Sequence, residues 1–303
     1  MLGCFFLFLE NIMPAGFFFI IATFLWGSSF VALKAAIDVY PPTFVIFFRM
    51  LLTLIVCLFL WPWVKRFKYQ KGDWKWLLVM SLAEPCLYFL FEGYALQYTS
   101  ASQAGIIVSC LPLLVAFFAF FLIQEKLSKN IIIGFSLCIT GSILLSLVSP
   151  QTEQAPHALL GNTLELIAML CAAFYVVSTK HLLQRYSALT LIALQGLSGT
   201  IFFAPFLFFI EWPPQHDLGA LMNIVYLGSA VTLGAYATYN YALARSSVLT
   251  AAAYSNLVPI FALLLSTLLL NEVLTSWQWV SIFIVFVGIM VSKGHSNRKV
   301  IEV

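Results

Sequence analysis

The chain has 303 residues, of which 62% are hydrophobic and only 9% are charged. Soluble domains carry roughly 25% charged residues, so this composition excludes a compact soluble fold and indicates a protein that lies in lipid. The formal net charge of +3 comes without a basic stripe on a polar face, which excludes nucleic acid as a partner. The six cysteines have no CxxC spacing and no paired histidine, so we expect no metal site, no disulfide and no cofactor.

Apolar stretches long enough to cross a bilayer recur along the whole chain. After a short N-terminal extension, residues 1–13, we predict ten transmembrane helices. They cover residues 14–37, 42–63, 74–97, 101–123, 130–149, 160–183, 188–210, 217–243, 247–270 and 275–292. A short tail, residues 293–303, follows the last helix, and Met13 is an alternative start to Met1.

The lysines and arginines predict which way the helices run. If the N-terminus lies inside, thirteen of the fifteen fall in inner loops or in the tail, and none falls in an outer loop. They are Lys65, Arg66, Lys68, Lys71, Lys75, Lys126, Lys129, Lys180, Arg185, Arg245, Lys293, Arg298 and Lys299. Because cytoplasmic loops carry the excess of basic residues, we expect a multi-pass protein of the plasma (bacterial inner) membrane with both termini in the cytoplasm.

The two halves of the chain resemble each other. A constant shift without gaps places Tyr94-Ala95-Leu96 on Tyr241-Ala242-Leu243, and in the same register Pro112 falls on Pro259, Glu125 on Glu272 and Gly141 on Gly288. The first two predicted helices of each half match less well, with the offset slipping by one. We therefore predict two five-helix repeats, 14–149 and 160–292. Five is an odd number, so the second repeat enters the membrane upside down, an arrangement typical of alternating-access transporters.

These motifs resemble the EamA branch of the drug/metabolite transporter superfamily. The resemblance covers nearly the whole chain, and its marks are Trp26-Gly27-Ser28-Ser29-Phe30, Arg49, the segment from Tyr94-Ala95-Leu96 to Ser100-Ala101-Ser102, Pro112, Pro259, Gln124-Glu125-Lys126-Leu127 and Asn271-Glu272-Val273-Leu274. It implies ten helices around a central cavity. It also implies a cargo among amino acids, nucleosides, amines, drugs or related metabolites, often carried out of the cell.

Two acidic residues interrupt the apolar sequence of the third predicted helix. Glu84 lies roughly 15 Å from its inner end at 1.5 Å per residue, near the middle of the bilayer. Tyr88 and Glu92 follow at intervals of four and share its helix face. Because charge in lipid is costly, this face must turn to the interior or to a wet cavity, where it could bind solute or protons. Pro85 should kink the helix and free a carbonyl beside Glu84.

Further residues are candidates for the same solute site. Trp26 lies at the depth of Glu84 and could hold a cation against its ring, although packing is the alternative. Arg49 could pair with the acidic residues or meet a carboxylate of the cargo. The weaker candidates are Tyr175, Tyr239, Asn240, Tyr254, Asn256, Gln103 and Gln195. Pro112 and Pro259 predict bends in the fourth and ninth helices, which could serve in gating.

Four charged residues have structural interpretations. We expect Lys34 to extend its amine to the outer surface, and Glu165 to line the outer mouth or to pair with Lys34. Glu125 and Glu272 close the fourth and ninth helices as caps.

These observations predict a secondary transporter that works by alternating access. Its cargo is a small organic metabolite, with an amino acid or another amine favoured by the acidic residues, and either a proton or a solute gradient drives it. A nucleoside or drug efflux carrier is the alternative, followed by a non-transporting scaffold and an intramembrane enzyme. The enzyme is disfavoured because the histidines lie in loops or at helix ends, which leaves no candidate catalytic residue. Both a monomer and a homodimer remain open.

Overall fold

The computed structural model describes residues 15–60, 69–123, 129–148, 152–211, 217–246 and 248–293. In these ranges the regular structure is helical, apart from one isolated bridge between Thr152 and Ala155. Seven helical stretches are long and apolar enough to cross a membrane, and three shorter apolar helices accompany them. The predicted all-α membrane fold is confirmed. The extension 1–13, with both candidate starts, lies outside the described residues, as do most of the tail and Lys65, Arg66, Lys68, Gln124, Glu125, Lys126 and Leu127.

Five crossings come from each half of the chain. The first half contains α2 (Ala15–Ile37), α3 (Pro42–Phe59), α5 (Trp74–Ser81) with η1 (Leu82–Leu87) and α6 (Tyr88–Tyr98), α7 (Ala101–Ile107) with η2 (Val108–Cys110) and α8 (Leu111–Ile123), and α9 (Lys129–Val148). The second half contains α10 (Ala158–Leu182), α11 (Ala188–Phe203) with η3 (Ala204–Phe208), α12 (Leu218–Tyr226) with η4 (Leu227–Ala235) and α13 (Tyr236–Ala244), α14 (Val248–Ser255) with α15 (Val258–Leu269), and α16 (Ser276–Lys293). In both halves, the third and fourth crossings are therefore interrupted.

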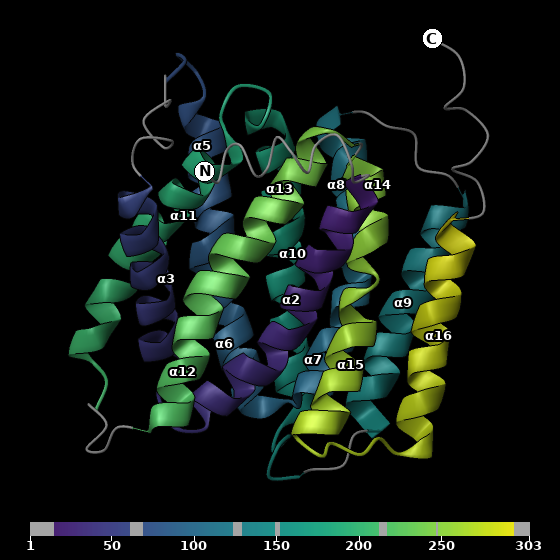
Figure 1. The fold of residues 1–303 in the computed structure, drawn as a ribbon. Helices are drawn as coiled ribbons and strands as arrows, with labels where there is room; N and C mark the ends of the chain where they lie inside the picture. The colour runs from purple at the N-terminus through teal and green to yellow at the C-terminus, as the bar shows by residue number, and fades with distance from the viewer. Residues whose placement is uncertain are drawn as a thin grey trace.

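The two halves run in opposite directions through the bundle. In Figure 1, α2 begins at the top and descends, whereas its counterpart α10 ascends, and α16 ends at the top. We call this end the upper end and the opposite one the lower end. Counterpart crossings pack against each other: α3 against α11, α9 against α16, and, between the fourth and ninth crossings, α7 against α15 and α8 against α14. This pairing of like with like is what an approximate twofold axis across the bundle produces.

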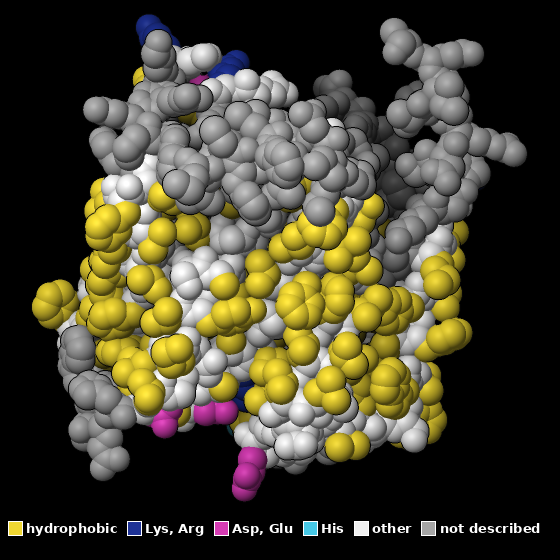
Figure 2. Space-filling model, viewed as in Figure 1, with side chains coloured by type: hydrophobic (Ala, Val, Ile, Leu, Met, Phe, Trp, Pro, Cys, Tyr) yellow, Lys and Arg dark blue, Asp and Glu magenta, His cyan; other side chains and the backbone are white. Residues whose placement is uncertain are grey.

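The sides of the bundle are apolar and its ends are charged. Figure 2 shows hydrophobic side chains over the visible side, Lys and Arg protruding at the upper edge, and Asp and Glu at the lower edge. Large side chains such as Phe59, Phe208 and Phe209 are more than four-fifths exposed. In water such exposure would be unfavourable, but in a bilayer these side chains contact lipid tails.

Two lysines in counterpart positions each close a helix end. Lys34 of α2 is buried and donates hydrogen bonds to the carbonyls of Leu96 (2.7 Å), Thr99 (3.4 Å) and Gln154 (3.0 Å) at the lower end. Lys180 of α10 does the same at the upper end, to Leu243 (2.7 Å), Ala244 (3.4 Å) and Ser246 (2.6 Å). The prediction that Lys34 reaches the outer surface was wrong, because the unpaired carbonyls that end a helix bind the amine instead.

Glu272 closes a helix beginning. Its carboxylate accepts hydrogen bonds from the backbone N–H groups of Ala101 and Ser102, both at 2.9 Å, and from the Ser102 hydroxyl. A negative charge is stabilised at a helix N-terminus by those free N–H groups. Glu272 is a cap, as predicted, but of the start of α7 and not of the ninth helix, and it thereby joins the ninth crossing to the fourth.

Gly161 lets α10 approach α6 closely. A Cβ atom built there would lie 2.7 Å from the backbone nitrogen of Thr99 and 2.8 Å from the carbonyl oxygen of Ala95. Both are backbone atoms at the end of a helix, so they cannot move aside as a flexible side chain would.

We predict that Gly161→Val destabilises the protein by about 1–3 kcal/mol, the usual cost of overpacking. A lower melting temperature of the purified protein in detergent would show this. Gly219→Ala is the matched control, because a Cβ atom there meets only the Asp217 side chain, at 3.2 Å. Equal melting temperatures for the two variants would contradict the prediction.

Candidate functional site

The third crossing of the first half is broken at Glu84. Its backbone is extended (φ −148°, ψ 118°), and the peptide bond to Pro85 is cis. A residue that precedes proline is disfavoured in the helical conformation. The freed carbonyl of Glu84 accepts a 3.5 Å hydrogen bond from Gln195 Nε2, so the helix breaks where the sequence predicts it.

The third crossing of the second half is irregular at the corresponding depth, without a proline. There the segment η4 carries Thr232, whose hydroxyl donates to the Leu227 carbonyl at 2.8 Å and accepts from Arg49 Nε at 2.7 Å. In the register that places Lys34 on Lys180, Arg49 falls on Gln195. Each second crossing thus contacts the irregular third crossing of the other half.

A cavity lies between these irregular segments. Both halves contribute to its wall. The lining residues are Trp26, Ser29, Phe30, Arg49, Glu84, Tyr88, Phe89, Glu92, Val108, Leu111, Met169, Ala172, Tyr175, Val176, Tyr236, Tyr239, Ser255 and Val258. Of the predicted site residues, Glu84, Tyr88, Glu92, Trp26, Arg49, Tyr175 and Tyr239 therefore meet in one place.

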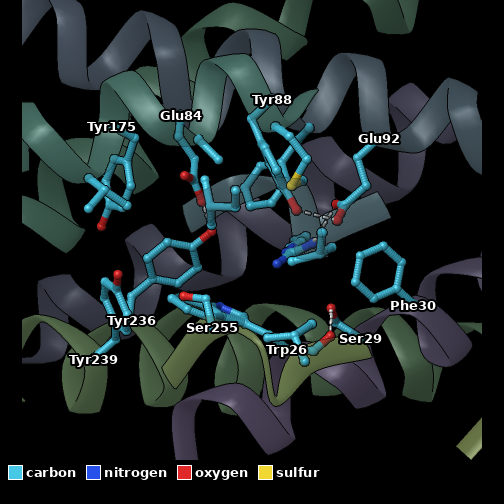
Figure 3. Close-up of a pocket in the computed structure, with 18 residues that line it drawn as sticks. Trp26, Ser29, Phe30, Glu84, Tyr88, Glu92, Tyr175, Tyr236, Tyr239 and Ser255 are labelled. Carbon is cyan, nitrogen blue, oxygen red and sulfur yellow. Dashed lines mark hydrogen bonds and ion pairs between the residues drawn. The ribbon is translucent and has the colours of Figure 1, made fainter. Parts of the chain in front are cut away.

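One wall of the cavity carries the carboxyl groups. Glu84 and Glu92 are 4% and 3% exposed. Tyr236 donates its hydroxyl proton to Glu84 Oε1, and Tyr88 donates to Glu92 Oε1 at 2.6 Å. Figure 3 shows the Tyr236 ring reaching across the cavity toward Glu84, while Tyr88 and Glu92 lie side by side. Each carboxyl group thus has one phenol partner.

Arg49 provides the positive charge of the cavity. Its guanidinium carbon lies 4.0 Å from the centroid of the Phe89 ring, and Nη1 lies 4.0 Å from Glu92 Oε2. Nη1 has no hydrogen-bond partner among the described residues. Arg49 therefore balances the charge of Glu92, which is one of its two predicted roles. Its Nη1 donor stays free for the other predicted role, contact with a carboxylate of the cargo.

Aromatic rings form the opposite wall. The Trp26 ring lies 5.3 Å from Tyr236 and 4.7 Å from Tyr239, and Tyr175 lies 5.9 Å from Tyr236, all between centroids. Within the described part of the chain, the Trp26 indole N–H has no acceptor. This wall can hold the apolar part of a solute and also offers it one hydrogen-bond donor.

The remaining predicted residues do not line the cavity. Tyr254 stacks on Phe19 with centroids 5.0 Å apart, and Asn240 accepts from the Tyr175 hydroxyl at 3.3 Å, behind the aromatic wall. Gln103 accepts from Asn162 Nδ2 at 3.0 Å. Gln195 holds the broken helix, as described above, and Asn256 is buried between α14 and α15.

The predicted bends fall close to their prolines. A single 3-10 turn, η2, ends at Cys110, just before Pro112, and the ninth crossing is interrupted before Val258, just before Pro259. Tyr236 was not among the predicted residues, although it lies three residues before Tyr239 on the same helix face and could have been found by that spacing.

Two tyrosines join the halves at opposite ends of the bundle. At the lower end, the Tyr40 hydroxyl accepts from the Asp217 backbone N–H at 2.9 Å and lies 3.5 Å from the Asp217 carbonyl oxygen. At the upper end, the Tyr186 hydroxyl donates to Asp73 Oδ2 at 2.8 Å, and Arg185 forms an ion pair with the same carboxylate. We call these contacts the lower latch and the upper latch. Tyr40 and Tyr186 are counterparts, and each aspartate directly precedes a third crossing.

A family model described as the EamA-like transporter family matches the chain twice, over residues 13–147 and 159–293. The chain belongs to the EamA-like transporter family. The predicted resemblance and the fold class of two inverted five-helix repeats are confirmed. Among curated relatives are the uncharacterized transporter YetK of Bacillus subtilis (strain 168), 27% identical over 88% of this chain and 82% of its own, and YcxC of the same organism, 25% identical over 94% and 95%.

A further uncharacterized transporter, from Archaeoglobus fulgidus, is 28% identical over 82% of this chain and 86% of its own length. A solved crystal structure superposes on 92% of this chain and 96% of its own with a TM-score of 0.67 at 18% identity, which shows a shared fold. This EamA family member is a multi-pass membrane protein whose relatives are named as transporters.

We predict that Arg49→Met lowers the free energy of unfolding by about 3 kcal/mol, because it leaves Glu92 buried without its cation. Adding Glu92→Gln should recover much of the loss. Thermal unfolding of the three proteins in detergent measures both effects. The matched control is Arg245→Met, which removes an exposed arginine that lies over the Tyr241 ring. Wild-type stability of Arg49→Met would instead show that Arg49 is not needed to balance Glu92.

Proposed function

We propose that this EamA protein carries a small zwitterionic or amine-bearing metabolite, most simply an amino acid, across the membrane by alternating access. The observation that carries this proposal is the mixture of groups in the cavity. Glu84 and Glu92 can accept hydrogen bonds from an ammonium group, while Arg49 Nη1 and the Trp26 indole N–H are buried donors without an acceptor among the described residues.

A buried donor without an acceptor costs free energy. A solute carboxylate would remove this cost at Arg49 and at Trp26. An ammonium group beside Glu84 would meet a carboxylate and the faces of Trp26 and Tyr236, which attract cations. A nucleoside or a drug is the second candidate, because the aromatic wall could stack on a flat ring.

The latches support the alternating-access part of the proposal. Each latch joins one half to the other at a single end, and both contacts are formed here. Opening one latch while the other stays closed would admit solute from one side only. The interruptions before Pro112 and Pro259 lie where the helices would have to bend.

The charge distribution supports a cytoplasmic upper end. Lys71, Lys75, Arg185 and Arg245 flank crossings at that end, and Glu153 and Glu211 lie in loops at the other. By the positive-inside rule this places the upper end in the cytoplasm, as in a plasma (bacterial inner) membrane protein with both ends of the chain inside. The proposal does not depend on whether the protein is a monomer or a homodimer.

We predict that Glu84→Gln weakens binding of an amine-bearing solute about 10- to 100-fold, because a hydrogen bond to a charged group contributes about 1.5–3 kcal/mol. A thermal-shift screen of purified protein against amino acids, polyamines and nucleosides would identify the solute. Uptake of the radiolabelled hit into proteoliposomes then compares the variant with wild type. Glu153→Gln is the matched control, since Glu153 is an exposed loop residue. Wild-type uptake by Glu84→Gln, with unchanged pH dependence, would refute the proposed role.

The latches give a second prediction. Tyr40→Phe removes a hydrogen bond of about 1 kcal/mol, which is about a fivefold change in equilibrium. It should therefore open the cavity toward the lower end. Tyr186→Phe should open the upper end less, because Arg185 still pairs with Asp73. Adding Arg185→Ala to Tyr186→Phe should bring the opening of the upper end close to the opening that Tyr40→Phe causes at the lower end.

A cysteine placed at Ala172, which lines the cavity, reports opening by its reaction with a membrane-impermeant maleimide added to either side of the vesicles. The half-buried Cys171 is replaced by serine in every variant. Faster labelling from the same side in both tyrosine variants would contradict the latch assignment.

A further inference from the structure

Glu165 of α10 is a buried carboxyl group that the proposed solute site does not use. Its side chain is fully buried, and neither oxygen has a hydrogen-bond partner among the described residues. It does not line the cavity. It lies one helical turn before Met169, which does, or about 6 Å along the helix axis. Because α10 ascends through the bundle, Glu165 lies on the lower side of the cavity (Figure 1).

The charged and titratable groups that face Glu165 come from the helices packed against α10. Glu92 and Tyr88 of α6 interact with it electrostatically. Arg49 of α3 lies beside Glu92, and Glu84 belongs to the same crossing as Tyr88 and Glu92. The segments α7, η2 and α8, which also contact α10, contain no charged residue.

Among the described residues, no lysine or arginine forms an ion pair with Glu165, including Lys75 of α5 and Lys129 of α9, two helices that also pack against α10. Arg49 is placed beside Glu92, and Lys34 is engaged with three backbone carbonyls. The predictions that Glu165 lines an outer mouth or pairs with Lys34 are therefore wrong. An ionised carboxylate that is buried without donors is far more costly than a neutral carboxylic acid, and the nearby charge of Glu92 adds to that cost.

Polar side chains lie between Glu165 and the lower end. Asn162 lies one turn further down α10 and accepts from the Thr99 hydroxyl at 2.7 Å, while its amide donates to Gln103. Thr99 in turn contributes one of the carbonyls bound by Lys34. Glu165 thus lies between Glu92, at the cavity, and a hydrogen-bonded polar cluster toward the lower end of the bundle.

We infer that Glu165 is an intramembrane proton-binding site that couples proton movement to solute movement. In the closed state its carboxyl group holds the proton. When the lower latch opens, water reaches it, the O–H bond breaks, and the proton passes to water and leaves a carboxylate. A hydronium ion in water that enters the cavity from the upper end then returns a proton to Glu165 by way of Glu92, which leaves neutral water and restores the carboxylic acid. The coupling rests on the proposed transport function, but the protonated state of Glu165 does not.

Infrared difference spectroscopy of the full chain in lipid vesicles tests the protonated state without any solute. We expect wild type at neutral pH to show the carbonyl stretch of a protonated carboxyl group that Glu165→Gln lacks. Glu165→Asp should retain a shifted band, and the control Glu153→Gln should leave the band unchanged. Gln has the shape and neutrality of the protonated acid, so this variant should fold. An identical spectrum for wild type and Glu165→Gln would overturn the inference.

Vesicles that contain the pH-sensitive dye pyranine test the coupling, with a mixture of proteinogenic amino acids as the probe. Wild type should give a pH change inside on addition of the mixture. Glu165→Gln should lose that change but keep exchange of radiolabelled amino acid. Retention of the pH change by Glu165→Gln would overturn the coupling. A Glu165 band without amino-acid flux in wild type would support the proton site and refute the proposed function instead.

Discussion

The scarcity of water in the bilayer core is the constraint on which the rest of this structure depends. A polar group there must find its partner within the protein. Lys34 and Lys180 show the effect most plainly, since each is drawn from the surface to the carbonyls at the end of a neighbouring helix. Glu272 does the same at the beginning of α7. These charged side chains fix the positions of helix ends.

The approximate symmetry explains where the interior is irregular. The third crossing of each half is interrupted at a similar depth, and a residue of the opposite second crossing contacts each interruption. Arg49 and Gln195 occupy corresponding positions, but only one of them is charged. The arrangement of helices is thus repeated in the two halves, whereas the charge at corresponding positions is not. A symmetric frame can open toward either side, and an asymmetric lining can recognise an asymmetric solute.

Buried polar groups without hydrogen-bond partners among the described residues lie in or next to the cavity. The free donors of Trp26 and Arg49 border the cavity, and the carboxyl group of Glu165 lies just below it. Because unsatisfied groups are costly in lipid, this arrangement favours a site where a solute and a proton complete the bonding. The same free-energy cost accounts for the small number of charged residues in the chain.

The sequence by itself determined the membrane environment, the number of crossings, their inverted repetition and the break at Glu84. Composition, hydrophobic length and proline chemistry are local properties of the sequence, so their effects do not depend on contacts between helices. Seven of the residues selected from the sequence line one cavity, because mid-span charge and aromatic spacing indicate the interior. Only the tertiary structure decided the partners. From the sequence, the Lys34 amine could reach the surface or bind backbone carbonyls, and the Glu165 carboxyl group could have a cation as its partner or none. No feature of the sequence indicated that Tyr40 and Tyr186 join the two halves. Which of these occurs depends on side chains from distant crossings, and their approach is fixed by helix packing rather than by the local sequence.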